Sequence, residues 1–251
     1  MDHRILLDQI AAQLSASLGE QLVGVYVHGS LAHGDFDWDA SDLDLIAIVR
    51  GGLNPSLRQG VIEGLLDIEA QFPPRGIELS LVRREFSLRF VYPTPYELHF
   101  SNTSRESFLA DPRAFCDDAW QVDHDLATHF ALIREKGITW RGEEIGAVFG
   151  EVPQKLLLDS VWRDLNASMA DLDANPAYLV LNLCRTLAYS ATGRMLSKGQ
   201  GAAWAWGELP AMYQDLVRGA LERRLDLKSQ PEARQTLQAF CRYCRQRLAR
   251  P

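Results

Sequence analysis

The sequence lacks the features that mark membrane, secreted and repeat proteins. No apolar run approaches the roughly 18 residues of a membrane-spanning helix, and the start, Met1-Asp2-His3-Arg4, lacks the charged-then-apolar layout of a signal peptide. It also contains no internal repeat and no low-complexity segment. We therefore expect a cytoplasmic globular protein without a membrane partner. Nothing in the sequence demands assembly, so we expect a monomer.

Positive charge and cysteine are also scarce. The net charge is −7, which argues against nucleic acid as a partner, because phosphate binding needs a basic surface. The same balance fits a small cationic substrate. The chain has four cysteines, which we expect to be reduced thiols in the cytoplasm. Cys241 and Cys244 form one Cys-x-x-Cys pair with no second pair and no nearby histidine, so we expect no zinc site there.

Hydrophobic periodicity predicts a sheet with packed helices in the N-terminal part. Apolar residues recur at helical spacing over 3–18 and 56–72. Residues 22–28, 43–49 and 77–83 are short apolar runs bounded by turn residues, which predicts strands. The run at 43–49 is almost unbroken, so we expect a central strand buried on both faces. The order helix, strand, strand, helix, strand predicts a mixed sheet covered by helices.

The pattern changes near residue 123, after which strand signals are nearly absent. Helical periodicity dominates there, at 123–136, 153–173, 176–192, 208–225 and 231–248. The sequence therefore predicts an α+β fold in which an N-terminal domain over 1–115 precedes a C-terminal helical bundle over 116–251.

The residues richest in chemistry lie between the first two predicted strands. A Gly29-Ser30 turn follows the first apolar run, and Asp42 and Asp44 open the next. Side chains alternate along a strand, so these two aspartates project from one face. A pair of close carboxylates is a hard-oxygen site suited to Mg²⁺. The turn before them can offer backbone N–H groups and a hydroxyl to a triphosphate.

Gly29-Ser30, eleven further residues and Asp42-Leu43-Asp44-Leu45 resemble the signature of the polymerase-beta-type nucleotidyltransferases. The resemblance implies that Asp42 and Asp44 hold Mg²⁺, as two ions, on the phosphates of ATP. It also implies that the Gly29-Ser30 turn binds the triphosphate tail.

A third carboxylate, Glu78, lies within the apolar strand predicted over 77–83. A buried Glu is costly unless it is paired or bound to a metal. An edge-strand position facing water is the alternative. The superfamily takes its third acidic residue from such a strand, so the resemblance implies that Glu78 completes the metal site or acts as general base on a substrate hydroxyl.

Two further segments, Leu179–Lys198 and Arg89–Phe100, resemble the aminoglycoside adenylyltransferases that modify streptomycin and spectinomycin. The resemblance implies an ATP site between the two domains. Arg185 and Lys198 match residues that reach the phosphates, although each alone would be read as surface charge. Ser41 matches a phosphate or metal-site contact, and Glu78 matches the catalytic base.

The sequence departs from streptomycin-modifying relatives at two places. Those relatives carry Trp where this chain has Thr103, and another Trp within the segment corresponding to 166–176. Asp171 and Asp173 in that segment can meet a cationic acceptor, or they can be a solvated helix end. The missing aromatic surface argues against streptomycin more than against spectinomycin.

Three functions follow from these residues. The first is transfer of AMP from ATP to a small cationic aminoglycoside or aminocyclitol. The second is the same chemistry on another small metabolite or on a protein side chain. The third is nucleotide binding without turnover, against which the set of Asp42, Asp44 and Glu78 argues.

Overall fold

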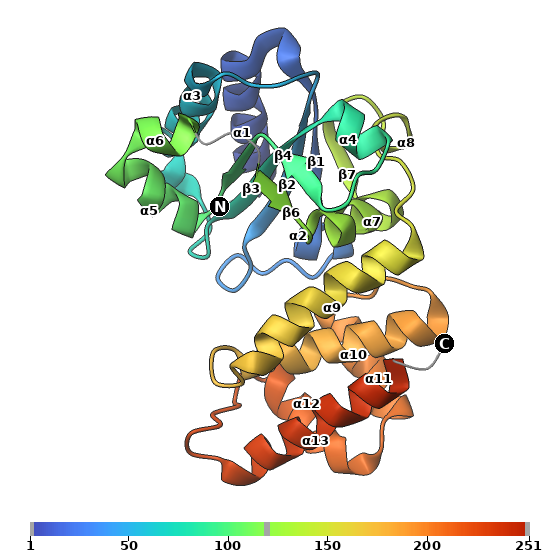
Figure 1. Cartoon of the computed structure of the whole chain (residues 1–251). Helices are drawn as coiled ribbons and strands as arrows, with labels where there is room; N and C mark the ends of the chain where they lie inside the picture. The colour runs from blue at the N-terminus through green and yellow to red at the C-terminus, as the bar shows by residue number, and fades with distance from the viewer. Residues whose placement is uncertain (1–2, 118–120, 249–251) are drawn as a thin grey trace. The chain divides into compact units, whose positions relative to one another are not determined.

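The computed structural model describes residues 3–117 and 121–248. The chain divides into two compact units, Met1–Leu157 and Leu158–Pro251 (Figure 1). This division falls later than the predicted boundary between residues 115 and 116. The reason is that strand β7 (Ile138–Gly142) pairs with β1 (Leu22–Val27) in the N-terminal sheet, a pairing that the sequence pattern did not reveal.

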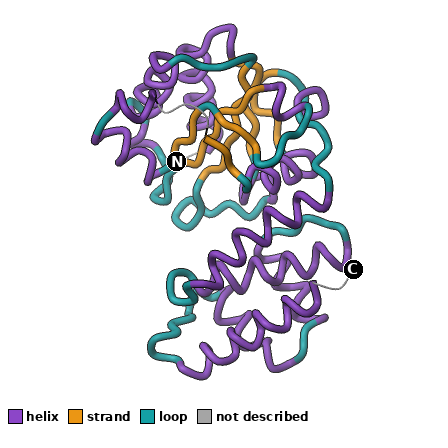
Figure 2. The backbone as a smooth tube through the Cα atoms, viewed as in Figure 1, coloured by secondary structure: helices purple, strands orange, loops and turns teal. Residues whose placement is uncertain are grey.

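The N-terminal unit contains a sheet covered by helices (Figures 1 and 2). Its other strands are β2 (Leu43–Val49), β3 (Ile77–Arg83), β4 (Thr94–Tyr96), β5 (Leu98–Phe100) and β6 (Gln121–Asp123). Its helices are α1 (His3–Leu18), α2 (Gly29–His33), α3 (Pro55–Leu66), α4 (Arg84–Leu88), α5 (Asn102–Ala110), α6 (Pro112–Asp117), α7 (Leu126–Lys136) and α8 (Ile145–Val148), with 3₁₀ turns η1 (Gly19–Gln21) and η2 (Glu69–Gln71).

The main sheet has five strands in the order β5-β3-β2-β1-β7. Strands β2 and β3 are parallel and are joined through α3, whereas the other neighbours are antiparallel. Strands β4 and β6 form a separate two-stranded sheet. The prediction that 43–49 is a central buried strand is confirmed, since β2 has a neighbour on each side and all but one of its residues are buried.

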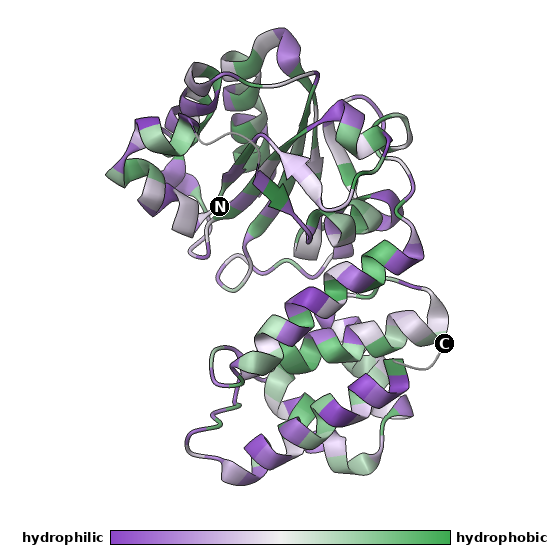
Figure 3. Ribbon diagram, viewed as in Figure 1, coloured by the Kyte–Doolittle hydropathy of each residue, from purple (hydrophilic) through white to green (hydrophobic). Residues whose placement is uncertain are grey.

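Alternating side chains divide the core into two layers. On one face, Leu45 and Ala47 pack with α1 and α3; we call this the α1 face. On the other, Ile46 and Ile48 pack with Phe130 of α7 and with α8; we call this the α7 face. Figure 3 shows the apolar character of these strands. Because successive residues alternate, every side chain of β2 is assigned to one of the two layers.

The C-terminal unit is a helical bundle with a core of its own. Helix α9 (Gln154–Ala170) spans the division between the units, and the bundle continues with α10 (Pro176–Thr192), α11 (Lys198–Glu208), η3 (Ala211–Tyr213), α12 (Gln214–Leu221) and α13 (Pro231–Leu248). Helix α10 packs against α11, α12 and α13. The Asn175 side chain accepts a hydrogen bond from the Tyr178 N–H at its start, and Gly193 ends it with φ +69°.

The predicted α+β class is confirmed, and so are most predicted elements. Helix α11 was missed because its first turn, Lys-Gly-Gln-Gly, has low helix propensity. It forms because Ser197 and Gln200 make a capping box, each side chain accepting from the other's backbone N–H. Among the described residues, no helix is both long and apolar enough to span a membrane.

The cysteines of the bundle are core residues. Cys184 on α10 and Cys241 and Cys244 on α13 are buried free thiols. Burial raises the pKa of Cys184 to about 12, and it raises the pKa of the other two as well. The thiols therefore stay protonated and serve as small apolar side chains.

A buried cluster of charged side chains lies at the end of the main sheet where β3 ends. Glu97, only 7% exposed, accepts hydrogen bonds from Arg83 Nε at 2.5 Å, Arg58 Nη2 at 3.1 Å and the Leu53 N–H at 2.7 Å. Burial by itself would raise the pKa of Glu97, but these three donors outweigh it and hold that pKa below its usual value.

We predict that Glu97→Gln lowers the free energy of unfolding at pH 7 by about 3 kcal/mol, because two arginines lose a buried counter-charge. A carboxyl whose pKa is lower in the folded state stabilises above its unfolded-state pKa of about 4.3. The difference in the free energy of unfolding between wild type and variant should therefore shrink as pH falls through the folded-state pKa of Glu97. Urea unfolding at several pH values measures this difference. Glu85→Gln, which removes an exposed carboxylate beside Arg83, is the matched control; equal losses in both would contradict the prediction.

Candidate active site

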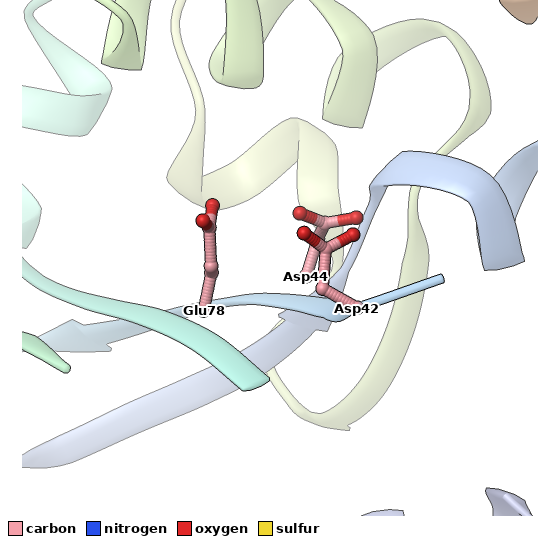
Figure 4. A group of neighbouring side chains, drawn as sticks. All are labelled: Asp42, Asp44 and Glu78. Atoms are coloured by element: carbon pink, nitrogen blue, oxygen red, sulfur yellow. The ribbon is translucent and has the colours of Figure 1, made fainter. Parts of the chain in front are cut away.

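Two aspartates mark the start of β2. Asp44 is the second residue of this strand, and Asp42 lies one residue before it. Asp44 alternates with Leu43 and Leu45, which are buried on the α1 face, so its carboxylate points to the α7 face. Figure 4 shows the Asp42 and Asp44 carboxylates side by side and directed the same way.

Glu78 completes a group of three carboxylates. It is the second residue of β3 and lies directly opposite Asp44 in the parallel register. Oxygen atoms of Asp42, Asp44 and Glu78 all lie within 4.8 Å of one another. Strand β3 is flanked by β2 and β5, so Glu78 is not on an edge strand. Its side chain is exposed, and the pairing of β3 with β5 starts one residue later, at Leu79.

Gly29 packs directly on the Asp44 carboxylate. Its φ is +61°, and a Cβ at this position would lie 1.7 Å from Oδ2 of Asp44. A side chain here would therefore be strained and would displace the carboxylate. Glycine brings the start of α2, which follows β1, into contact with the acidic group. The sequence predicts that Gly29-Ser30 and the aspartates lie close together, and in the fold Gly29 contacts Asp44 directly.

Two serines lie on the segments that flank the aspartates. In the part of the chain that the structure describes, Ser30 Oγ is a buried oxygen with no hydrogen-bond partner. A buried hydroxyl in that state costs free energy unless a ligand satisfies it, which fits a phosphate group at this turn. Ser41 Oγ accepts from the Asp37 N–H at 3.2 Å, and the Ser41 N–H donates to Asp37 O at 2.7 Å. Ser41 thereby fixes the loop that leads into Asp42.

A histidine pair that the sequence did not reveal supports this corner. His28, the residue before Gly29, donates its backbone N–H to Asp44 O at 3.0 Å. Its ring is buried and lies 4.7 Å from the ring of His129 on α7, measured between centroids. Burial and then the neighbouring His129 hold the pKa of His28 well below its usual value. The backbone of His28 therefore links this segment to β2, and its buried ring packs against His129 of α7.

The two basic residues of the predicted nucleotide site lie in the C-terminal unit. Arg185 Nε donates to Leu196 O at 2.7 Å, and its Nη1 donates to Asn182 Oδ1 at 3.1 Å. Lys198 is the first residue of α11, and its Nζ lies 5.1 Å from the ring centroid of Tyr178. These contacts orient Arg185 on α10 and place Lys198 on the same bundle. Their binding to phosphate stays a prediction.

The residues expected to meet the acceptor are less defined. Asp171 accepts a hydrogen bond from the Asp173 N–H at 3.1 Å, and Asp173 makes an ion pair with Arg234 of α13. Both contacts are typical of a structured helix end, and an acceptor role for either aspartate stays a prediction. Thr103 is exposed in the first turn of α5. Strand β5 leads to α5 at the end of the sheet where Glu78 lies, since Phe100 pairs with Leu79.

The acidic group fits Mg²⁺ bound together with a nucleoside triphosphate. Three carboxylates within 4.8 Å supply hard oxygen ligands, and the adjacent turn supplies a buried hydroxyl without a partner. A sheet with carboxylates on a central parallel pair, beside a Gly-Ser segment, agrees with the nucleotidyltransferase signature that the sequence resembles.

Known proteins match this chain along most of its length. The family model for the C-terminal domain of aminoglycoside adenylyltransferases matches residues 147–247. An aminoglycoside (3'') (9) adenylyltransferase of Klebsiella pneumoniae is 26% identical over 244 residues, with 94% of this chain and 91% of the relative covered. The corresponding protein of Escherichia coli is 27% identical over 234 residues, with 91% and 86% covered.

A solved structure shows the same fold. The crystal structure of spectinomycin adenyltransferase AAD(9) from Enterococcus faecialis with ATP and spectinomycin matches with a TM-score of 0.80 at 15% identity, over 97% of this chain and 98% of that one. The chain is thus similar over most of its length to aminoglycoside adenylyltransferases, which are nucleotidyltransferase enzymes, and residues 147–247 match their C-terminal domain.

We predict that Gly29→Ala weakens Mg·ATP binding at least tenfold, because the new Cβ displaces the Asp44 carboxylate; tenfold corresponds to about 1.4 kcal/mol. Calorimetric titration measures the affinity. Gly34→Ala is the matched control, since Gly34 also has positive φ, +79°, but a Cβ there meets nothing within 4 Å. Equal loss in both variants would mean that backbone strain, not the contact with Asp44, is responsible.

Proposed function

We propose that this protein is a Mg²⁺-dependent adenylyltransferase that moves AMP from ATP to a hydroxyl of an aminoglycoside or aminocyclitol antibiotic. Spectinomycin is the better candidate and streptomycin the poorer one. The observation that carries the proposal is the group of Asp42, Asp44 and Glu78, with oxygen atoms within 4.8 Å of one another. Similarity to the aminoglycoside adenylyltransferases supports the reaction class, and antibiotic resistance is the role we infer from it.

The reaction that this site supports is an in-line displacement at phosphorus. The acceptor hydroxyl oxygen bonds to the α-phosphorus of ATP, and the bond from that phosphorus to the α–β bridging oxygen breaks. Pyrophosphate leaves with the electron pair, and the hydroxyl proton passes to a carboxylate. Mg²⁺ held by the acidic group would neutralise negative charge on the phosphate oxygens. The protein itself contributes position and charge.

Glu78 is the carboxylate suited to receive the proton. It lies across from Asp44 on the neighbouring strand, and it is the exposed member of the group, whereas Asp42 and Asp44 are half-buried. An exposed carboxylate can approach an incoming acceptor, while the two aspartates are held beside the Gly29 turn. We therefore propose Asp42 and Asp44 as metal ligands, and Glu78 as a third ligand, as the general base, or as both.

The remaining polar residues fit the nucleotide. Gly29, Ser30 and Ser41 lie next to the aspartates and are proposed to bind the phosphates. Arg185 and Lys198 are proposed to add charge-assisted contacts to the same phosphates. That ATP lies between two domains, and that the protein is a cytoplasmic monomer without nucleic-acid or membrane partners, stay predictions.

The test of this function is AMP transfer from ATP across a panel of hydroxylated amines. Pyrophosphate release with spectinomycin, absent in Asp44→Asn, is the expected result. Release with a metabolite or a protein, and not with any aminoglycoside, would favour the alternative acceptors. Mg·ATP binding with no release for any acceptor would favour a nucleotide-binding regulator.

We predict that streptomycin is adenylylated at least a hundredfold less efficiently than spectinomycin, compared as kcat/KM under identical Mg·ATP. Thr103 and the residues at 166–176 provide none of the aromatic surface expected for streptomycin. Each buried aromatic side chain contributes on the order of 1–3 kcal/mol of transfer free energy, so the loss of two amounts to about a hundredfold or more. Efficient modification of streptomycin would show that other side chains supply this contact.

We predict that Glu78→Gln lowers kcat by about 10²–10⁴-fold, the range of general-base catalysis, and leaves the Kd of Mg·ATP within about twofold. Single-turnover kinetics and calorimetry measure the two quantities. Asp44→Asn is the comparison variant and should lose Mg·ATP affinity together with turnover. If Glu78→Gln loses nucleotide affinity to the same degree, Glu78 is mainly a metal ligand.

A further inference from the structure

A polar pair on β3 and β5 has no part in the proposed chemistry. Ser80 Oγ and His99 Nδ1 are 3.0 Å apart and hydrogen-bonded, and the two residues are direct cross-strand partners. Ser80 is 5% exposed, whereas His99 is half-buried. Among the described residues, Ser80 is the hydrogen-bond partner of His99, and the bond involves Nδ1 of the His99 ring. The other ring nitrogen, Nε2, is therefore left for a ligand.

The ring of His99 lies on the face of the sheet that carries the acidic group. Leu98 and Phe100, its neighbours on β5, are buried in the α1-face core. His99 therefore points to the α7 face. Glu78 and Ser80 alternate with Leu79, which is in the same α1-face core, so they point to the α7 face as well. His99 and Glu78 consequently share one surface.

The order of strands places His99 on the side of Glu78 that faces away from Gly29 and Ser30, the residues proposed to bind phosphate. Going across the sheet, the Gly29 turn follows β1, Asp44 is on β2, Glu78 is on β3 and His99 is on β5. In an in-line displacement, the attacking oxygen enters opposite the leaving group. If pyrophosphate lies by the Gly29 turn, the acceptor enters from the β3 and β5 side. Strand spacings put the Cα atoms of His99 and Glu78 about 8 Å apart, a span that a multi-ring acceptor bridges.

We propose that His99 binds the acceptor through Nε2, and that Ser80 is a positioning residue that fixes the orientation of the His99 ring. This inference rests on the proposed function and deepens it, because it assigns a binding residue for a polyhydroxylated, cationic aminocyclitol. His99 hydrogen-bonds to a hydroxyl or amino group of the acceptor, one strand away from the hydroxyl that Glu78 deprotonates. It thereby contributes to which hydroxyl reaches the α-phosphorus.

The surroundings of His99 suit such an acceptor. Burial lowers the pKa of the ring, and nearby Asp123 opposes this only in part, so the ring is neutral at physiological pH. A neutral ring does not repel a cationic acceptor. The ring also packs edge-on against Tyr96, with centroids 6.3 Å apart, which together with Ser80 limits its rotation.

Steady-state kinetics with spectinomycin and Mg·ATP test the proposal. We expect His99→Leu to raise the KM for spectinomycin roughly fivefold to tenfold, the effect of one lost hydrogen bond, with the Kd of Mg·ATP within about twofold of wild type. Ser80→Ala should raise the same KM by a smaller factor. His99→Gln keeps a hydrogen-bonding group in place and should recover part of the affinity. His124→Gln changes another half-buried histidine of the same unit, in ring contact with Tyr92, and should change neither constant.

The possible results distinguish a failure of the role proposed for His99 from a failure of the proposed function. A wild-type protein that transfers no AMP to spectinomycin overturns both. A wild-type protein that does so, with spectinomycin KM unchanged in His99→Leu and His99→Gln, overturns only the role of His99. A parallel loss of Mg·ATP affinity, or a Ser80→Ala variant with a lower Tm and no change in KM, shows a purely structural pair and also overturns it.

Discussion

The parallel register between β2 and β3 is the constraint on which the site depends. It sets Asp44 opposite Glu78 and gathers three carboxylates within 4.8 Å. Each pair of like charges at that separation repels by about 1–3 kcal/mol, depending on the local dielectric. The backbone hydrogen bonds of a buried central strand hold the group together against this repulsion. In the proposed reaction, a cation bound together with phosphate removes this repulsion, so binding energy is directed to the reacting groups.

The surrounding packing keeps that register from slipping. At the end of the sheet near the carboxylates, Gly29 rests on Asp44, and His28 joins the turn to β2 and to α7. At the other end, Glu97 ties α3 and the end of β3 together through Arg58 and Arg83. Apolar layers on both faces fix which side chains point where. A shift of one residue would send Glu78 into the α1-face core, which makes the register well specified.

The strand order also arranges the polar groups of the α7 face in a fixed order across the sheet. The Gly29-Ser30 segment follows β1, the carboxylates lie at β2 and β3, and the polar pair of Ser80 and His99 lies at β3 and β5. In the proposed reaction, the leaving group, the reacting phosphorus and the acceptor follow one another in this order across the sheet. This separation lets acceptor recognition change on β5 and the segments after it without disturbing the metal ligands. Thr103, where we expect streptomycin-modifying relatives to carry an aromatic residue, lies in one such segment.

The sequence by itself determined much of the fold and the acidic group. The bounds of α1, β2, β3, α10 and α13 follow from local periodicity and caps, because apolar spacing and turn residues act over short stretches. Asp42, Asp44 and Glu78 could be found from the cost of charged residues in apolar strands and from a motif with fixed spacing. Only the tertiary structure decided what depends on distant partners. Strand β7 forms because β1 offers it an edge, and His28 meets His129 across about a hundred residues of chain. Ser80 meets His99 through antiparallel pairing. Such contacts leave no periodic trace in the sequence, since they depend on which strands and helices become neighbours when the core is buried.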